Sequence, residues 1–138
     1  MVVDTARFFS SLANKLYRSI GGRPPRANLP VTQHNFSLVR LGSEYGGWTF
    51  CALDDLAGST VLSCGLGEDA SFDIEFASRF QAKVVLVDPT PRAIQHFEGI
   101  LGRMGSPSEA KYSSDGRQPL EAYDLSKLGP ENLKLIPQ

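Results

Sequence analysis

The stretch VLSCGLGEDASFD, residues 61–73, decides the fold class of this chain. An apolar run leads into two glycines separated by one residue, Gly65 and Gly67, and then into a segment that can begin a helix. A second apolar run, residues 83–87, ends at Asp88. A glycine-rich turn after one strand and an acid at the end of the next are typical of α/β proteins that bind a nucleoside. The sequence therefore predicts a nucleoside site where two neighbouring strands end.

The flanking sequence extends this unit into an alternating α/β pattern. Phe72, Phe76 and Phe80 recur every four residues, which predicts a helix with one apolar face for the sheet. Thr90 can cap a second helix that begins with proline at its first position. The pattern predicts core strands at about 60–64, 83–88 and 133–136, with helices at about 70–80 and from 91 to a glycine at 102 or 105. Crossovers of one hand then give a parallel sheet, half of a doubly wound fold.

The part of the chain before this unit divides into two regions. Residues 5–20 have the apolar spacing of an amphipathic helix, which two glycines stop and a Pro- and Arg-rich linker follows. We therefore divide the chain into an N-terminal helix and linker, residues 1–35, and one domain, residues 36–138. The domain begins with two short β-rich runs around a glycine-rich loop, which predicts a hairpin. Trp48, directly after that loop, is expected in the core.

Composition excludes several classes of protein. The 138 residues are 41% hydrophobic and 21% charged, values typical of a globular domain, and the net charge of −1 gives no reason to expect a nucleic-acid partner. No apolar run is long enough to span a bilayer, and the N-terminus is a poor signal peptide, so we expect a cytoplasmic protein. Cys51 and Cys64 are isolated, which argues against a metal site and predicts reduced thiols, with Cys64 buried in its strand.

The chemistry of the glycine turn points to the parts of a ligand. Gly65 can adopt backbone angles closed to other residues, and Gly67 has no side chain to block a ligand that lies against the backbone. The following helix directs its first amides to the same place, which favours anionic or polar groups. Asp88 stands where a carboxylate can accept both hydroxyls of a ribose.

The identity of the nucleoside depends on charge. The spacing of Gly65, Gly67 and Ala70 also satisfies the dinucleotide pattern, so the glycines alone do not separate NAD from S-adenosylmethionine. Glu68 and Asp69, however, occupy the place of a pyrophosphate and would repel it. S-adenosylmethionine carries a sulfonium and an ammonium group, which acidic neighbours suit, so the charges favour the methyl donor.

Three segments together resemble a known family. Residues 44–48 (EYGGW), 65–73 (GLGEDASFD) and 87–91 (VDPTP) are similar, in this order, to the FkbM-type family of S-adenosylmethionine-dependent methyltransferases. The resemblance runs from about residue 36 to the end of the sequence and is carried by the combination of segments. It implies the Rossmann-like class I methyltransferase fold and methyl transfer to an oxygen, here a small-molecule or sugar hydroxyl.

The resemblance also implies roles for individual residues. Gly65, Gly67 and Asp69 would lie near the methionine part of the cofactor, Asp88 would bind the ribose, and Pro89 and Thr90 would line the adenine side. Many methyltransferases carry an acid two residues before the first glycine, where this chain has Ser63, so Glu68 or Asp69 is expected to serve the ammonium group. The expected cofactor-binding residues are Ser63, Gly65, Gly67, Glu68, Asp69, Asp88, Pro89 and Thr90.

The complete fold has further strands beyond the three that this sequence predicts. Their loops normally form the acceptor pocket, so no catalytic residue is assigned and we expect this chain alone to be inactive. Val61 and Leu62 would lie on an open apolar edge, which predicts a fragment of a longer protein or a partner strand, including self-association. The alternatives are an NAD-dependent oxidoreductase domain and a non-catalytic nucleoside-binding or interaction module.

Overall fold

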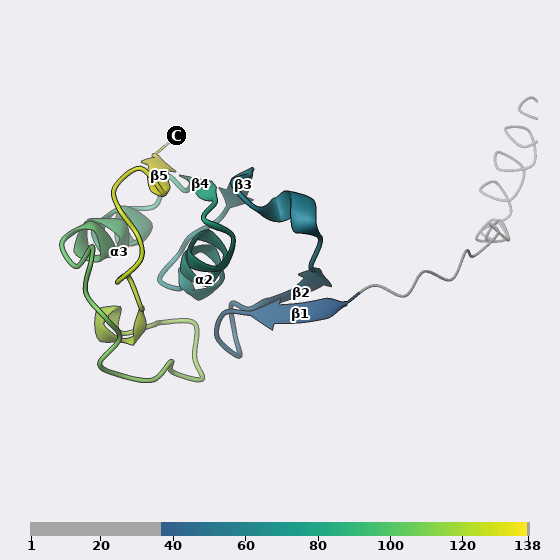
Figure 1. Ribbon diagram of the computed structural model, residues 1–138. Helices are drawn as coiled ribbons and strands as arrows, with labels where there is room; N and C mark the ends of the chain where they lie inside the picture. The colour runs from purple at the N-terminus through teal and green to yellow at the C-terminus, as the bar shows by residue number, and fades with distance from the viewer. Residues whose placement is uncertain (1–36, 138) are drawn as a thin grey trace, which may run out of the picture. The chain divides into compact units, whose positions relative to one another are not determined.

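The computed structural model describes residues 37–137, which form a mixed α/β domain (Figure 1). The amphipathic helix predicted at residues 5–20, and the linker after it, lie outside the described residues. A small hairpin comes first, and a three-stranded sheet with two helices follows. Among the described helices, none combines the length and hydropathy that a membrane span requires.

The hairpin consists of β1 (Leu38–Leu41) and β2 (Trp48–Cys51), paired antiparallel as predicted. Gly42 begins the connecting loop with φ of +88°, a conformation that favours glycine. A short 3₁₀ turn, η1 (Asp54–Leu56), then leads to the main sheet.

The main sheet contains β3 (Thr60–Cys64), β4 (Lys83–Val87) and β5 (Leu133–Ile136). All three strands are parallel and lie in the order β3-β4-β5, so β3 forms one edge of the described sheet. The predicted strands are confirmed to within one residue. Their carboxyl ends lie along the same margin of the sheet, because parallel strands share one direction.

Both helices cover the same face of this sheet (Figure 1). Helix α2 (Ser71–Phe80) connects β3 to β4, and α3 (Pro91–Leu101) begins the connection from β4 to β5, which continues through a second 3₁₀ turn, η2 (Leu120–Ala122). Successive crossovers in one direction and of one hand place their helices on one side. Alternate residues of β4 that face the helices are therefore almost fully buried.

The opposite face of the sheet has no helix over it among the described residues. Leu62, in the middle of β3, is 66% exposed, and Cys64 at the end of the same strand is also exposed. The expectation that Cys64 is buried was therefore wrong. The reason is topological, because side chains alternate along a strand and the residues between the helix-facing ones point to the uncovered side.

The three phenylalanines of α2 contact a partner that the sequence did not predict. The ring centroid of Phe50, on β2, lies 5.9, 5.6 and 6.0 Å from those of Phe72, Phe76 and Phe80. Such distances are typical of packed aromatic pairs. The aromatic stripe therefore joins α2 to the hairpin, so the helix lies in contact with both the hairpin and the sheet.

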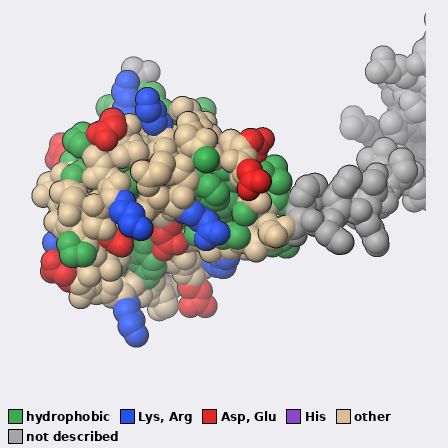
Figure 2. Space-filling view, in the orientation of Figure 1, with side chains coloured by type: hydrophobic (Ala, Val, Ile, Leu, Met, Phe, Trp, Pro, Cys, Tyr) green, Lys and Arg blue, Asp and Glu red, His purple; other side chains and the backbone are tan. Residues whose placement is uncertain are grey.

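Charged side chains are mixed over the surface that Figure 2 shows. Lys and Arg side chains alternate with Asp and Glu over this face of the described residues, without a large patch of one sign.

Candidate functional site

A cleft of about 1030 Å³ opens at the carboxyl end of β3. The hairpin contributes residues 45–50 to its wall, and β3 with the glycine turn contributes residues 61–69. Phe72 and Asp73 of α2, Arg92 of α3 and Gly116 from the loop before η2 complete the lining. The cleft is thus formed by segments that are far apart in the sequence, on the side of the sheet where α/β proteins bind ligands.

The two glycines of the turn have the conformations that the sequence predicts. Gly65 has φ of +91° and Gly67 has φ of +56°, both in the region that favours glycine. A Cβ atom built on either residue meets nothing within 4 Å, so open space lies beside the backbone at both positions. The turn therefore leaves its backbone accessible to a ligand.

Asp88 holds the turn in place from behind. Its Oδ2 atom accepts hydrogen bonds from the amides of Leu66 and Gly67, each at 2.9 Å. Its Oδ1 atom accepts from the amide and the hydroxyl of Thr90, at 2.9 and 2.7 Å. Burial alone would raise the pKa of Asp88, but the hydrogen bonds from Gly67, Thr90 and Leu66 lower that pKa below its ordinary value. Asp88 is therefore an ionised anchor of the loop.

The same contacts correct one prediction about α3. Thr90 is the N-cap residue of this helix, but its side chain makes no capping hydrogen bond. Its hydroxyl donates to Asp88 instead, whose ionised carboxylate lies two residues earlier in the chain and is a strong acceptor. Proline at the first helical position is confirmed.

Asp69 connects three segments at the other end of the turn. Its Oδ2 atom accepts hydrogen bonds from the Ser43 hydroxyl at 2.6 Å and from Nε2 of Gln118 at 3.1 Å, and its Oδ1 atom accepts from the Ser71 amide at 3.0 Å. Burial acts to raise the pKa of Asp69, but the hydrogen bonds from Ser43, Ser71 and Gln118 outweigh it and lower the pKa. This carboxylate is therefore committed to joining the hairpin loop, the helix start and a later loop.

Gln118 is a residue of the site that sequence reasoning missed. Its side chain is almost fully buried and donates to Asp69 and to the carbonyl oxygens of Ser113 and Asp115, while its Oε1 accepts the Ser113 amide. The loop so formed also contacts the hairpin, because a Cβ atom at Gly116 would lie 2.6 Å from the Tyr45 ring. No local pattern marks Gln118, since its partner lies 49 residues earlier in the chain.

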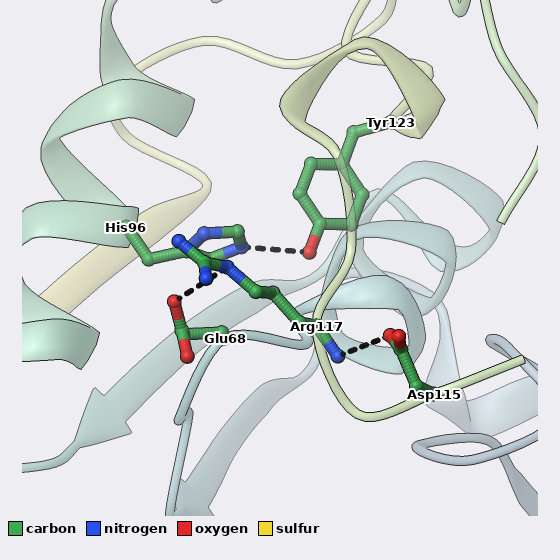
Figure 3. A network of polar contacts seen from close by, with 5 residues as sticks. All are labelled: Glu68, His96, Asp115, Arg117 and Tyr123. Carbon is green, nitrogen blue, oxygen red and sulfur yellow. Dashed lines mark hydrogen bonds and ion pairs between the residues drawn. The ribbon is translucent and has the colours of Figure 1, made fainter. Parts of the chain in front are cut away.

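A second polar network, around Tyr123 and His96, supports the start of α2 (Figure 3). The Tyr123 hydroxyl accepts the Ala70 amide at 3.0 Å and lies 2.8 Å from Nε2 of His96. The tautomer of His96 decides which of the two groups donates in this pair. Burial lowers the pKa of His96, and the charges of Glu68 and Asp69 only partly oppose that effect. A neutral histidine is thus the form that fits this network.

Glu68 has a basic partner at the mouth of the cleft. One carboxylate oxygen of Glu68 lies 3.2 Å from Nε of Arg117, the contact drawn in Figure 3. The Gln118 amide donates to the Glu68 carbonyl oxygen at 2.9 Å, so the two chain segments run together here. The charge of Glu68 is therefore partly compensated.

Asp73 differs from these three carboxylates. It is 5% exposed, it lines the cleft, and its buried Oδ1 atom has no hydrogen-bond partner among the described residues. Burial raises the pKa of Asp73 to about 6; a hydrogen bond from the Ser63 side chain opposes that rise, and the charge of Asp69 adds to it. Leaving a buried polar atom unpaired costs about 1–3 kcal/mol, so the unpaired Oδ1 atom of Asp73 requires an explanation.

Comparison with protein-family models, with curated proteins and with solved structures finds no match to this chain. The assignment of the site therefore depends on its own geometry. Among residues 37–137, no three His, Cys, Asp or Glu side chains are grouped so that they could hold a metal ion.

The structure divides the predicted site residues into two groups. Ser63, Gly65, Gly67, Glu68 and Asp69 line the cleft. The three others lie behind the turn and do not line it: Asp88, Pro89 and Thr90. Their contacts with ribose and adenine stay predictions.

Two aromatic residues of the hairpin face the cleft. Trp48 is 68% exposed and Tyr45 is 70% exposed, so the expectation that Trp48 belongs to the core was wrong. Trp48 lies two residues before Phe50 on the same face of β2, but no helix residue between positions 37 and 137 covers it as α2 covers Phe50. The hairpin therefore contributes two exposed aromatic side chains to the cleft.

Proposed function

We propose that the cleft binds S-adenosylmethionine and that residues 36–138 are the cofactor-binding half of a methyltransferase similar to the FkbM type. The expected reaction is transfer of the sulfonium methyl group to a hydroxyl oxygen of a small molecule or sugar. Donor and acceptor would have to be held in line, which is mostly a matter of positioning. We assign no catalytic residue.

The observation that carries the proposal is that the amides of the turn already have protein acceptors. The Leu66 and Gly67 amides donate to Asp88, the Ala70 amide donates to Tyr123, and the Ser71 amide donates to Asp69. A dinucleotide site needs such amides free, because they bind the pyrophosphate at the helix N-terminus. This turn therefore favours a ligand without phosphate.

The charges beside the turn support the same choice. Glu68, Asp69 and Asp73 lie along the cleft, and the partners that Asp69 has in the structure are neutral groups. Carboxylates in such a position attract a sulfonium or ammonium group and repel a pyrophosphate. A cationic nucleoside fits this wall better than NAD does.

The ribose contact proposed for Asp88 requires a local exchange. A carboxylate has about four acceptor positions, and four protein donors occupy those of Asp88. Rotation of the Thr90 side chain would free one position on Oδ1, because its hydroxyl is held by that single contact. We therefore expect a ribose hydroxyl to replace the Thr90 hydroxyl.

Calorimetry on the whole chain tests the proposal. We expect S-adenosylhomocysteine to bind with one site per chain and NAD to give no binding heat under the same conditions. Binding of NAD without binding of S-adenosylhomocysteine would overturn the methyl-donor proposal in favour of an oxidoreductase domain. Thr90→Val tests the ribose contact of Asp88, because it keeps the size of the side chain and removes the hydroxyl that the ribose is expected to replace.

A non-catalytic interaction module is the second candidate. The observation in its favour is that β3 lies at the edge of the sheet among the described residues, with Leu62 66% exposed on the uncovered face. Strand edges of this kind can pair with another chain. A folded protein that binds neither nucleoside, but that forms a dimer in sedimentation equilibrium and loses it on Leu62→Lys, would favour this candidate.

A further inference from the structure

The inference concerns Asp73, which has the one cleft carboxylate oxygen that is buried and without a partner among the described residues. Glu68 has Arg117 as its partner, and Asp69 accepts three hydrogen bonds. Both of those carboxylates therefore have partners in the structure. Oδ1 of Asp73 has none among the described residues.

The position of Asp73 favours a ligand contact over a defect in packing. Its side chain is 5% exposed, and the residue belongs to the wall of the cleft. Buried polar atoms in folded proteins are almost always paired, and the exceptions often mark a missing ligand or ion. The residue also lies in the first turn of α2, where the helix dipole favours a negative charge.

The chemistry of the surroundings narrows the class of ligand group. A metal ion is disfavoured, because the described residues contain no group of three ligating side chains. The negative charges of Asp69 and Asp73 oppose a phosphate beside the start of α2, whereas the cationic residue of the lining, Arg92, belongs to the start of α3. An ammonium group has three donors and a positive charge, so it can pair with Oδ1 of Asp73 and still bond to neighbouring oxygens such as the Ser63 hydroxyl.

We propose that Asp73 binds the ammonium group of the ligand in the cleft, with Ser63 beside it. This inference rests on the proposed function, since it takes the ammonium group to be that of the methionine part of S-adenosylmethionine. It also replaces the sequence-based expectation that Glu68 or Asp69 serves this group. Many methyltransferases carry the acid near the end of the first core strand, where this chain has Ser63 in β3. Here the carboxylate belongs to Asp73, in the first turn of α2.

The test compares two ligands that differ in the ammonium group. S-adenosylhomocysteine carries the amino-acid part, and 5′-methylthioadenosine lacks it. Asp73→Asn keeps the shape of the side chain and removes the charge. We expect this variant to bind S-adenosylhomocysteine about tenfold more weakly or worse, as the loss of one charge-assisted hydrogen bond predicts, and to bind 5′-methylthioadenosine within about twofold of the wild type. Asp124→Asn, an exposed carboxylate outside the cleft, is the control and should bind both as the wild type does.

A second variant separates recognition of charge from a structural role. Ser63→Asp, combined with Asp73→Asn, returns a carboxylate to the neighbourhood of the missing one. We expect this pair to recover part of the affinity for S-adenosylhomocysteine and to leave 5′-methylthioadenosine unchanged. Thermal unfolding of each variant establishes that it is folded before its affinity is measured.

Each outcome decides one of the two proposals. If Asp73→Asn binds S-adenosylhomocysteine as the wild type does, or loses both ligands equally, the inference about Asp73 is overturned and the proposed function stands. If the wild-type chain binds neither ligand, the proposed function is overturned, and the inference with it.

Discussion

Asp88 and Asp73 are both buried carboxylates beside the glycine turn, one at the end of β4 and the other in the first turn of α2. Asp88 accepts four hydrogen bonds, whereas Oδ1 of Asp73 accepts none. Their pKa values move in opposite directions: burial raises that of Asp73 to about 6, while hydrogen bonding overcomes burial and lowers that of Asp88. Burial weighs more heavily on Asp73, and Asp88 has more hydrogen-bond donors, so both factors contribute to the difference.

The difference separates two uses of a carboxylate. The ionised form of Asp88 stabilises the fold, because its donors are in place before any ligand arrives. The ionised form of Asp73 destabilises the fold, because its charge is buried without a full set of partners. A buried carboxylate with an unpaired oxygen, such as Asp73, often marks a place where a ligand supplies the missing partner.

The largest expected effect on stability comes from removing the carboxylate of Asp88. Asp88→Ala leaves the buried Leu66 amide and its neighbour at Gly67 without an acceptor, so we expect the free energy of unfolding to fall by about 3 kcal/mol. Urea denaturation followed by circular dichroism measures it. Asp124→Ala is the control, since Asp124 is exposed and accepts only from Ser126; a similar loss there would contradict the special role of Asp88.

The second prediction has the opposite sign. Asp73→Asn removes a buried charge, so we expect the free energy of unfolding at pH 7.5 to rise by about 2 kcal/mol. In the wild type, the folded pKa of about 6 lies above the ordinary value of 3.8, so the folded state binds more protons between these values. Stability therefore falls as pH rises from about 4 to 6, and the variant should lack this fall.

The pH window distinguishes Asp73 from its neighbours. Asp69 and Asp88 have lowered pKa values, so the stability that they contribute is present above their ordinary range and is lost only as pH falls below it. Urea denaturation at several pH values between 4 and 7 measures the difference between the wild type and Asp73→Asn. A difference that does not change over this range would contradict the prediction.

The smallest effect on stability is expected at Gly67, in the glycine turn. Gly67→Ala places a side chain at φ of +56°, which costs about 1 kcal/mol. Gly58→Ala is the matched control, because Gly58 has φ of +69° and also meets nothing within 4 Å. We expect equal losses of stability in thermal unfolding, but a lower affinity for S-adenosylhomocysteine only in Gly67→Ala. Equal affinities in the two variants would show that the ligand does not lie against Gly67.

Local sequence patterns predicted the helices and strands well, but they predicted poorly which faces of those elements are buried. The apolar runs and the glycines gave β3, α2 and β4 to within one residue, because alternation and helical spacing are properties of short segments. The errors at Cys64 and Trp48 arose where burial depends on which face a distant helix covers. That information depends on topology, which no window of the sequence contains.

The site was predicted in part for the same reason. The turn that carries Gly65 and Gly67 is visible in the sequence, since its conformation needs glycine at fixed positions. The contacts of Asp69 with Ser43 and Gln118, and of Ala70 with Tyr123, join residues 26 to 53 positions apart. Serine, glutamine and tyrosine have many uses in proteins, so none of them marks such a partner locally.

The hydrogen bond between Asp69 and Gln118 has a consequence for the order of folding. Contacts between distant residues close late, because a long loop must be ordered before they form. The pairing of β3 with β4 spans a much shorter loop than the 49 residues that separate Asp69 from Gln118. During synthesis, the glycine turn would therefore emerge and begin to pair well before the loop that carries Gly116 and Gln118 exists. A ligand that contacts both the turn and this loop would bind only the finished domain, so its binding reports that folding is complete.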